Sequence, residues 1–307
     1  MDSQNSILNV AQNKLIHINQ IINQKRLACL IDDLEDMVSQ VCIIKGDVLS
    51  LQAYGQAGYR KTEDIDILLP RERIAGLVQK LLEKGYQSLS ANRNIQIFCF
   101  TSSHQLLPFI KIRDIVALHV DINFDILWGE YEGKRIDITE FLSDAVETNI
   151  YGYSVKTLPP LKSMVQLILH HYKDMNSIFL LATRKSIQYS MFRDIYNLLS
   201  HNQSDISPDR LYAISKKYEI IPYVFYMLYY TNQVFPNNML AQYISQFRTP
   251  EGESLLHSYG LCAKERKLWK VDFQTRLEAG NLYSLIKEDL TDWDKEKIAM
   301  NQRIFLR

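Results

Sequence analysis

The sequence predicts an α+β fold, in which a mixed sheet with flanking helices is followed by a helical C-terminal domain. Short strand-like runs alternate with helical patterns in the first half of the chain, and they disappear after Leu158-Pro159-Pro160. The chain has 307 residues, a length that suits two domains. We therefore expect one domain at residues 1–157 and a second, helical domain at residues 158–307.

Helical periodicity opens the chain. Apolar residues recur at intervals of three and four residues between positions 6 and 40, which predicts two helices with a break near Asn23–Arg26. A short buried strand at Gln40–Ile44 then ends at Lys45-Gly46. The next helix is expected to run from Asp47 to about Tyr54.

The remaining elements follow from similar patterns. A second strand is expected at Ile65–Leu69, followed by a helix at Arg71–Lys84 for which Gly85 supplies the C-terminal stop. Further strand-like runs occur at Ile95–Phe100, Phe109–Ile112 and Ile115–Phe124. Helical patterns cover residues 161–174, 183–200, 208–219 and 222–231.

Charge and cysteine content narrow the class of protein. Lys+Arg and Asp+Glu are equal at 35 each, so the net charge is zero, which argues against a broad basic surface for nonspecific nucleic-acid binding. The four cysteines include no CxxC pair, which favours reduced thiols over a zinc site or a disulfide framework. The polar N-terminus does not resemble a secretory signal, and the apolar stretch Ile220 to Tyr230 is too short to span a bilayer. We expect a cytoplasmic protein with no membrane association.

Three acidic residues carry the clearest chemical signal. Asp64 and Asp66 stand two apart at the start of an apolar strand, so their carboxylates project to the same side. Carboxylates held this close repel each other, and a divalent cation relieves the repulsion. Asp121 lies in another strand that can pair beside them, with Asp125 as the neighbouring alternative. Oxygen ligands favour Mg²⁺ or Mn²⁺, so we predict a metal site at Asp64, Asp66 and Asp121.

A second signal lies upstream of the acidic pair. The strand–Lys45-Gly46–helix turn directs backbone N–H groups and the positive end of a helix toward any phosphate bound there. Lys45 and Arg60 can add positive charge. We predict that Lys45, Gly46 and Arg60 face a triphosphate.

Together these residues resemble the polymerase-β nucleotidyltransferase superfamily, whose signature is a strand, a Gly-containing turn into a helix, a DxD strand and a later single Asp. The stretch IIKGDVLSLQAYGQAGYRKTEDIDILL is similar to a bacterial nucleotidyltransferase-like family with an LKG…Y…R…DIDLL pattern. Later matches, which extend the resemblance to about residue 200, are a strand at Leu118–Asn123 and helices at Leu167–His171 and Arg193–Leu199. The resemblance implies metal-dependent transfer of a nucleoside monophosphate from an NTP, such as ATP, with release of pyrophosphate. The acceptor is left open among a small molecule, a peptide or protein side chain, and an RNA end.

Two departures from the family pattern bear on the site. Gly46-Asp47 stands where the superfamily has Gly-Ser or Gly-Gly, and a carboxylate there repels phosphate unless it points away or caps the helix. Asn123 stands where a His is usual.

Two alternative functions stay open. They are a non-catalytic nucleotide-binding or regulatory protein that retains the fold, and a DxD glycosyltransferase. We interpret His170 as a residue that forms hydrogen bonds between the two domains, not as a metal ligand or a catalytic group.

Overall fold

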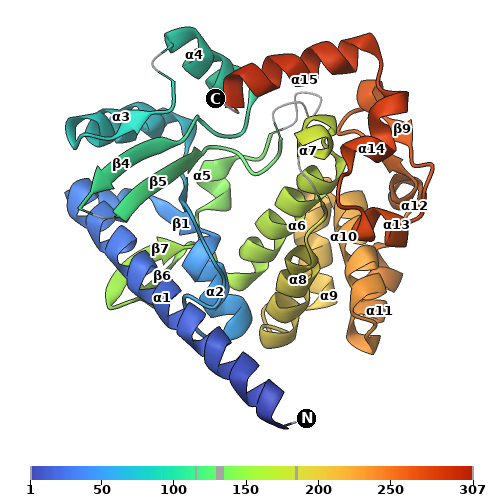
Figure 1. Cartoon of the computed structure of the whole chain (residues 1–307), viewed down its shortest axis with the longest axis horizontal. Coiled ribbons are helices and arrows are strands. Elements are labelled where there is room, and N and C mark those ends of the chain that lie inside the picture. The colour runs from blue at the N-terminus through green and yellow to red at the C-terminus, as the bar shows by residue number, and fades with distance from the viewer. Residues whose placement is uncertain (1, 91, 115, 129–134, 184–185, 306–307) are drawn as a thin grey trace. The chain divides into compact units, whose positions relative to one another are not determined.

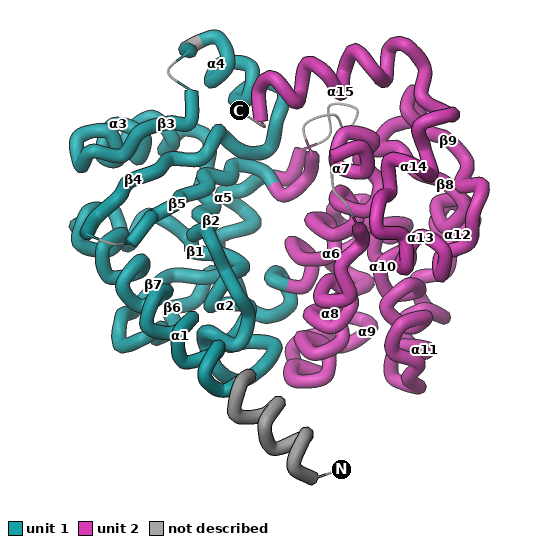
Figure 2. Tube along the Cα trace, viewed as in Figure 1, with its two compact units in different colours: residues 1–125, 137–163 teal, residues 126–136, 164–307 magenta. Residues whose placement is uncertain are grey.

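A computed structural model describes residues 2–90, 92–114, 116–128, 135–183 and 186–305. The chain divides into two compact units, coloured teal and magenta in Figure 2. Unit 1 comprises Met1–Asp125 and Asp137–Ser163, and unit 2 comprises Ile126–Ile136 and Met164–Arg307. The expected division into folding domains at residue 157 stays a prediction, because the units describe packing and not independent folding.

Unit 1 holds most of the strands that the sequence pattern predicts, three further strands (β3, β6 and β7), and the helices between them (Figure 1). Its helices are α1 (Asp2–Leu34), η1 (Glu35–Gln40), α2 (Gly46–Tyr54), η2 (Arg71–Arg73), α3 (Ile74–Glu83), α4 (Arg93–Ser102) and α5 (Ile138–Phe141). Its strands are β1 (Cys42–Ile44), β2 (Ile65–Leu68), β3 (Gln87–Ser88), β4 (Phe109–Arg113), β5 (Val116–Asn123), β6 (Val146–Ile150) and β7 (Tyr153–Thr157).

The main sheet is mixed, as expected. Its five strands lie in the order β1-β2-β5-β4-β3, with β2 and β5 parallel and the other pairs antiparallel. Leu118, Val120 and Ile122 of β5 are fully buried, whereas His119 and Asp121 between them are partly exposed. One face of β5 therefore packs into the core, and the other presents polar side chains.

A smaller hydrophobic core fixes the long helix α1 next to the sheet. Leu27 of α1, Val48 of α2, and Ile150 and Val155 of the β6–β7 hairpin are all buried in one cluster. Burying these side chains removes apolar area from water at about 25 cal/mol per Å². The cluster therefore holds α1, α2 and the hairpin together around the polar face of β5.

Two expectations about unit 1 are wrong. The expected break at Asn23–Arg26 does not exist, because α1 runs unbroken from Asp2 to Leu34. The expected strand Ile95–Phe100 is part of α4, whose N-terminus is capped by the Asn92 side chain accepting from the Asn94 N–H. This cap satisfies a backbone donor that a strand would have paired with a neighbour.

The expected stop at Gly85 is confirmed. Gly85 has φ +85°, a left-handed conformation that glycine adopts without a Cβ penalty. Its N–H donates to Leu82 O, and the N–H of Tyr86 donates to Leu81 O, so the last carbonyls of α3 are satisfied.

Unit 2 is mainly helical, as expected. From Pro160 onward the helices are α6 (Pro160–Asn176), α7 (Ile178–Thr183), α8 (Tyr189–His201), α9 (Pro208–Lys217), α10 (Ile221–Val234), α11 (Asn238–Phe247), α12 (Pro250–Leu256), η3 (Ala263–Glu265), α13 (Phe273–Glu278), α14 (Tyr283–Ile286), η4 (Lys287–Asp289) and α15 (Asp292–Phe305). A two-residue strand pair, β8 (Ser258–Tyr259) with β9 (Lys267–Leu268), is a small departure from the all-helical expectation. Tyr223, Tyr226 and Tyr230 of α10 are buried, so this tyrosine-rich stretch is part of the core of unit 2. No helix in the described ranges is both long and apolar enough to cross a lipid bilayer.

Candidate active site

Strand pairing in unit 1 brings the predicted acidic residues together. Asp66 of β2 and Asp121 of β5 are directly paired in the parallel register. Asp64 lies two residues before Asp66, in the segment immediately before β2, and it lines one pocket together with Asp121. Asp66 is buried at 6% exposure, Asp121 is partly exposed and Asp64 is exposed. The face therefore offers carboxylates from two adjacent strands.

Asp66 is held from two sides. Lys45 Nζ lies 2.8 Å from Asp66 Oδ1, and Asn123 Nδ2 donates to the same oxygen at 3.2 Å. Asn123, the residue that departs from the usual His, thus orients the carboxylate. Burial is the largest influence on the pKa of Lys45 and acts to lower it. The charges of Asp66, Asp121 and Asp64 and the hydrogen bond to Asp66 together outweigh burial and raise the pKa, so the ammonium stays protonated at neutral pH.

The surroundings favour the charged form of Lys45 but disfavour the charged form of Asp64. Crowding by surrounding protein atoms, followed by repulsion from Asp66, raises the pKa of the Asp64 carboxyl, although the residue keeps an exposed edge. Lys45 works against this shift. Added positive charge at Asp64 would therefore be stabilising, and the all-oxygen donor set of Asp64, Asp66 and Asp121 fits a hard divalent cation.

The turn between β1 and α2 lies beside Asp66. Lys45 has φ 56° and ψ −144°, and Gly46 has φ +44°. The first intrahelical bond runs from the Leu49 N–H to Lys45 O, so the N–H groups of residues 46–48 have no acceptor inside α2. The N-terminus of α2 can therefore present backbone donors to an anion.

The Asp47 carboxylate serves neighbouring elements of unit 1. Its Oδ1 accepts from Gly58 N–H at 2.9 Å, Tyr151 OH at 3.0 Å and Asn23 Nδ2 at 3.2 Å. Burial raises the pKa of this carboxyl, and the three donors partly oppose the shift. The side chain does not cap α2. Of the two expected ways to avoid phosphate, Asp47 takes the first, because it is turned toward α1, the loop at 55–62 and the hairpin.

Arg60 lies in the loop that Asp47 secures. The N–H groups of Tyr59 and Arg60 donate to Ser50 Oγ at 2.9 and 3.3 Å, which fixes the backbone of this loop to α2. The Arg60 side chain is partly buried. Its predicted contact with a triphosphate stays a prediction.

The helix α1 contributes two polar residues that the sequence analysis did not select. Arg26 Nε donates to Ala117 O at 3.1 Å, and its Nη1 donates to Thr62 O at 2.9 Å. Asn23 is buried and donates to Thr62 Oγ1 at 2.8 Å. These polar residues interrupt the apolar pattern of α1 at the position of the expected break, and that interruption was the available signal.

With this geometry in view, comparison with known families is decisive. A family model described as an uncharacterised nucleotidyltransferase matches residues 10–236, which is more than half of the chain. The chain belongs to this nucleotidyltransferase family. The family expected from the sequence motifs is thus confirmed.

Solved structures similar to this nucleotidyltransferase are distant. The antibiotic-resistance factor ANT(2'')-Ia is 12% identical with a TM-score of 0.38, and the alignment covers 64% of this chain and 93% of that chain. An antigenic nucleotidyltransferase-like protein from Paracoccidioides brasiliensis is 16% identical with a TM-score of 0.36, covering 69% of this chain and 92% of that chain. No protein of curated function matches the chain.

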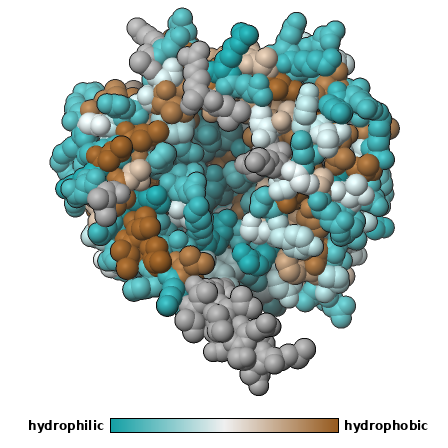
Figure 3. All heavy atoms as spheres, in the orientation of Figure 1, coloured by the Kyte–Doolittle hydropathy of each residue, from teal (hydrophilic) through white to brown (hydrophobic). Residues whose placement is uncertain are grey.

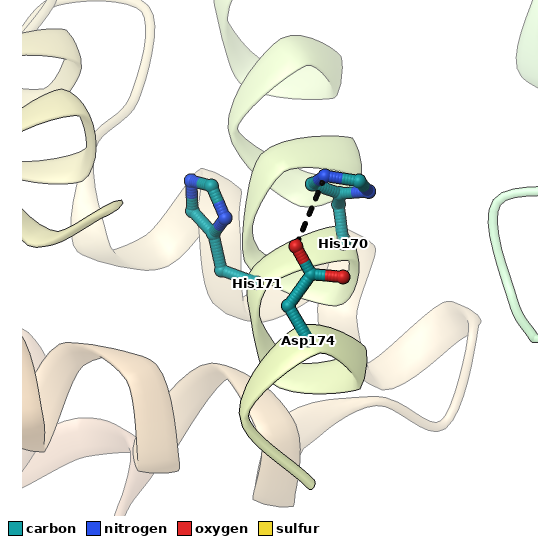
Figure 4. Close-up of side chains that lie close together, drawn as sticks. All are labelled: His170, His171 and Asp174. Atoms are coloured by element: carbon teal, nitrogen blue, oxygen red, sulfur yellow. Dashed lines mark ion pairs between the residues drawn. The ribbon is translucent and has the colours of Figure 1, made fainter. Parts of the chain in front are cut away.

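Unit 2 of the nucleotidyltransferase holds another cluster of possible ligands, on α6. His170, His171 and Asp174 offer ligand atoms within 4.8 Å of one another, and Figure 4 shows the two imidazole rings on either side of the carboxylate. His170 Nε2 lies 3.4 Å from Asp174 Oδ2, and Lys173 Nζ lies 3.8 Å from Asp174 Oδ1. Because Asp174 already has a cationic neighbour, we interpret the cluster as an ionic network of α6. The expected role of His170 between the domains stays a prediction.

Proposed function

We propose that this nucleotidyltransferase uses a divalent metal ion to move a nucleoside monophosphate from an NTP to an acceptor hydroxyl, with release of pyrophosphate. The observation that carries the proposal is the direct pairing of Asp66 with Asp121 on parallel strands, with Asp64 immediately before the first of them. Carboxylates on adjacent strands can hold two ions roughly 3.5–4 Å apart. Bound there, Mg²⁺ or Mn²⁺ would neutralise charge on the phosphates.

Each residue has a distinct part in the proposal. Asp64, Asp66 and Asp121 hold the metal, and Asp121 accepts the proton of the acceptor hydroxyl. Lys45, Gly46 and Arg60 bind the triphosphate. The contact of Lys45 with Asp66 supports this assignment, because it holds the ammonium beside a proposed metal ligand, where the phosphates of a metal-bound NTP would lie.

The alternatives stand differently after the comparisons. Membership of a nucleotidyltransferase family leaves no support for the glycosyltransferase reading. A non-catalytic protein stays the alternative, although its main hint, Asp47, is accounted for by the contacts of that side chain with Gly58, Tyr151 and Asn23. The cytoplasmic location also remains proposed, and the free state of all four cysteines is compatible with it.

The direct test is pyrophosphate release from ATP, GTP, CTP and UTP, each labelled at the α-phosphate and incubated with Mg²⁺ and a bacterial extract. The expected result is pyrophosphate release with one or more NTPs and transfer of the label to an acceptor. Chelation of the metal and the Asp66→Asn substitution should both stop release. If the wild type releases no more pyrophosphate than Asp66→Asn with any NTP, the non-catalytic alternative holds.

A further inference from the structure

A polar pocket of about 410 Å³ lies beside the acidic residues in unit 1. The helix α1, the segment at residues 61–64 and the strand β5 supply most of its wall. Its volume falls within the range of roughly 300–1,000 Å³ typical of small-molecule sites. The lining residues are Asn19, Ile22, Asn23, Arg26, Lys61, Thr62, Glu63, Asp64, Pro108, His119 and Asp121.

The pocket lies on one side of the three acidic residues, away from the turn at Lys45 and Gly46. Asp64 and Asp121 line it, whereas the described lining includes neither Lys45 nor Gly46. Phosphoryl transfer places the attacking and leaving oxygens roughly in line on opposite sides of the phosphorus. If the β- and γ-phosphates lie at the Gly46 turn, the attacking oxygen approaches from the Asp121 side, where the pocket lies.

The wall is polar, and part of it is rigid. Arg26 is anchored to Ala117 O and Thr62 O, so its position is fixed by backbone on both sides. Lys61 Nζ lies 2.5 Å from Glu63 Oε1, so these two charges largely cancel. His119 and Asn19 add groups that can donate or accept, while Ile22 supplies an apolar surface.

This composition suits an uncharged molecule with several hydroxyl groups. Amide, imidazole and hydroxyl side chains exchange hydrogen bonds with hydroxyls, and one apolar wall can cover the carbon skeleton. A strand of RNA needs a groove lined by cations and stacking aromatic rings. The pocket lining contains no aromatic side chain other than His119 among the described residues.

We propose that this pocket binds the acceptor, a small polyhydroxylated molecule of carbohydrate or polyol type, and the inference rests on the proposed function. The acceptor oxygen forms a bond to the α-phosphorus of the NTP, and the bond from that phosphorus to the bridging oxygen of the β-phosphate breaks. Pyrophosphate leaves with the electron pair of the broken bond. The hydroxyl proton passes to Asp121 and then to solvent.

A residue of α1 permits a test that leaves the acidic residues untouched. Figure 3 shows hydrophobic side chains gathered along α1, and among residues 13–34 of this helix the exposed large apolar ones are Leu15, Ile18, Ile21 and Ile22. Ile22 is 37% exposed and lines the pocket, whereas Ile18, one turn earlier, is 51% exposed and does not. Ile22→Trp should fill the pocket, and Ile18→Trp is the matched control.

The experiment measures binding and transfer separately in the full chain. Saturation-transfer NMR follows glucose, myo-inositol and glycerol as probes in the presence of Mg²⁺ and a nonhydrolysable ATP analogue, while calorimetry follows the Mg²⁺-bound analogue itself. Transfer from α-labelled ATP is then measured to each probe and to a short single-stranded RNA. We expect at least one probe to bind and accept label, with both signals reduced about tenfold or more in Ile22→Trp and unchanged in Ile18→Trp.

The outcomes separate this inference from the proposed function. Labelling of the RNA alone, equal probe binding by Ile22→Trp and wild type, or no binding of any probe would each overturn the inference while nucleotide binding persists. If the wild type does not bind the Mg²⁺-bound nucleotide analogue at all, that result would instead contradict the proposed function.

Discussion

At the scale of single residues, Asp66 and Asp64 differ in what their charge does for the fold. Asp66 is buried beside the Lys45 ammonium, so its carboxylate neutralises a charge that is itself largely shielded from water. Asp64 is exposed and is crowded by the charge of Asp66, which contributes to the raised pKa of its carboxyl. Two residues with the same proposed metal role therefore make opposite contributions to the metal-free protein.

This difference gives a paired prediction for Asp66→Asn and Asp64→Asn. Both variants should lose transfer, because each removes a proposed metal ligand. Asp66→Asn should also lower the free energy of unfolding by about 3 kcal/mol, the lower end of the range for breaking a buried ion pair. Asp64→Asn should leave it unchanged or raise it at neutral pH, because the neutral amide avoids the repulsion. Urea unfolding of both variants without metal measures the contrast, and equal stabilities would contradict it.

Asp121 supports a second prediction at this scale. In the proposed mechanism, Asp64 and Asp66 hold the metal–NTP complex without it, and removal of the acceptor proton needs the third carboxylate. Asp121→Asn should keep near-normal affinity for Mg²⁺-ATP and lose most of its kcat, by about 10²-fold or more. Asp125 follows the end of β5, so Asp125→Asn is the comparison. An inactive Asp125→Asn beside an active Asp121→Asn would show that the wrong carboxylate was chosen.

At the scale of elements, Asp47 joins four parts of unit 1. It accepts from Asn23 of α1, Gly58 of the loop before β2 and Tyr151 of the hairpin, while standing itself in the first turn of α2. A Ser or Gly at this position has no carboxylate to accept three donors. The departure from the family pattern therefore has a structural use, which is to hold the N-terminus of α2 against α1 and the hairpin.

We predict that Asp47→Asn retains the three contacts and changes the pH dependence of stability. Burial raises the pKa of the Asp47 carboxyl in the folded protein, so the folded state binds its proton more tightly than the unfolded state. Ionising Asp47 in the folded protein therefore lowers the free energy of unfolding. This loss is absent below the pKa that Asp47 has in the unfolded chain, and it develops as pH rises through the pKa that Asp47 has in the folded protein. Asp47→Asn should therefore gain stability over the wild type as pH rises through that window to neutral, with equal stabilities in acid. Thermal unfolding across pH measures the difference.

Asp47→Ala is the control for this prediction. It removes the acceptor as well as the charge, so it should be destabilised by about 1–3 kcal/mol, the cost of leaving buried donors unsatisfied. If Asp47→Asn is instead destabilised at neutral pH as much as Asp47→Ala, the ionised carboxylate itself stabilises the fold.

Sequence patterns predicted the parts of this fold that depend on local periodicity. The strand patterns around Asp66 and Asp121 were enough to predict the two strands that bring these carboxylates side by side, whereas Asp64 lies just before β2 and its place on the same face stays a prediction. The antiparallel register that brings Ile44 opposite Asp66, and with it the Lys45 contact, depends on pairing between distant segments. Periodicity carries no information about that register.

The two errors have different physical causes. Asn23 and Arg26 looked like a helix break because polar residues interrupt an apolar stripe, yet both are committed to hydrogen bonds with the segment before β2. Ile95–Phe100 looked like a strand because apolar residues are dense there, but the Asn92 cap and the local helical bonds decide the structure. In α1 the misread position coincides with the wall of the proposed acceptor pocket, to which Asn23 and Arg26 contribute.

At the scale of the whole molecule, the proposed acceptor must agree with the distribution of charge. The chain carries 35 basic and 35 acidic residues, so it offers no net attraction to a polyanion. Nonspecific binding to nucleic acid is dominated by phosphate contacts and weakens steeply as salt releases bound counterions. A small neutral acceptor needs no such long-range attraction, so neutrality and the pocket support the same acceptor class.

The last prediction follows from this neutrality. The full chain should bind a fluorescent single-stranded RNA weakly at low salt. The logarithm of the association constant should fall only slightly as the logarithm of the salt concentration rises. A protein that neutralises several phosphates shows a slope of about −0.7 for each one on a single strand. Fluorescence anisotropy over a salt series measures the slope. The variant Arg26→Ala checks that Arg26, a cation in the pocket wall, does not itself bind the RNA. Tight binding with a slope of several units would mean that basic residues gather into a nucleic-acid groove despite the zero net charge, and it would favour an RNA end as the acceptor.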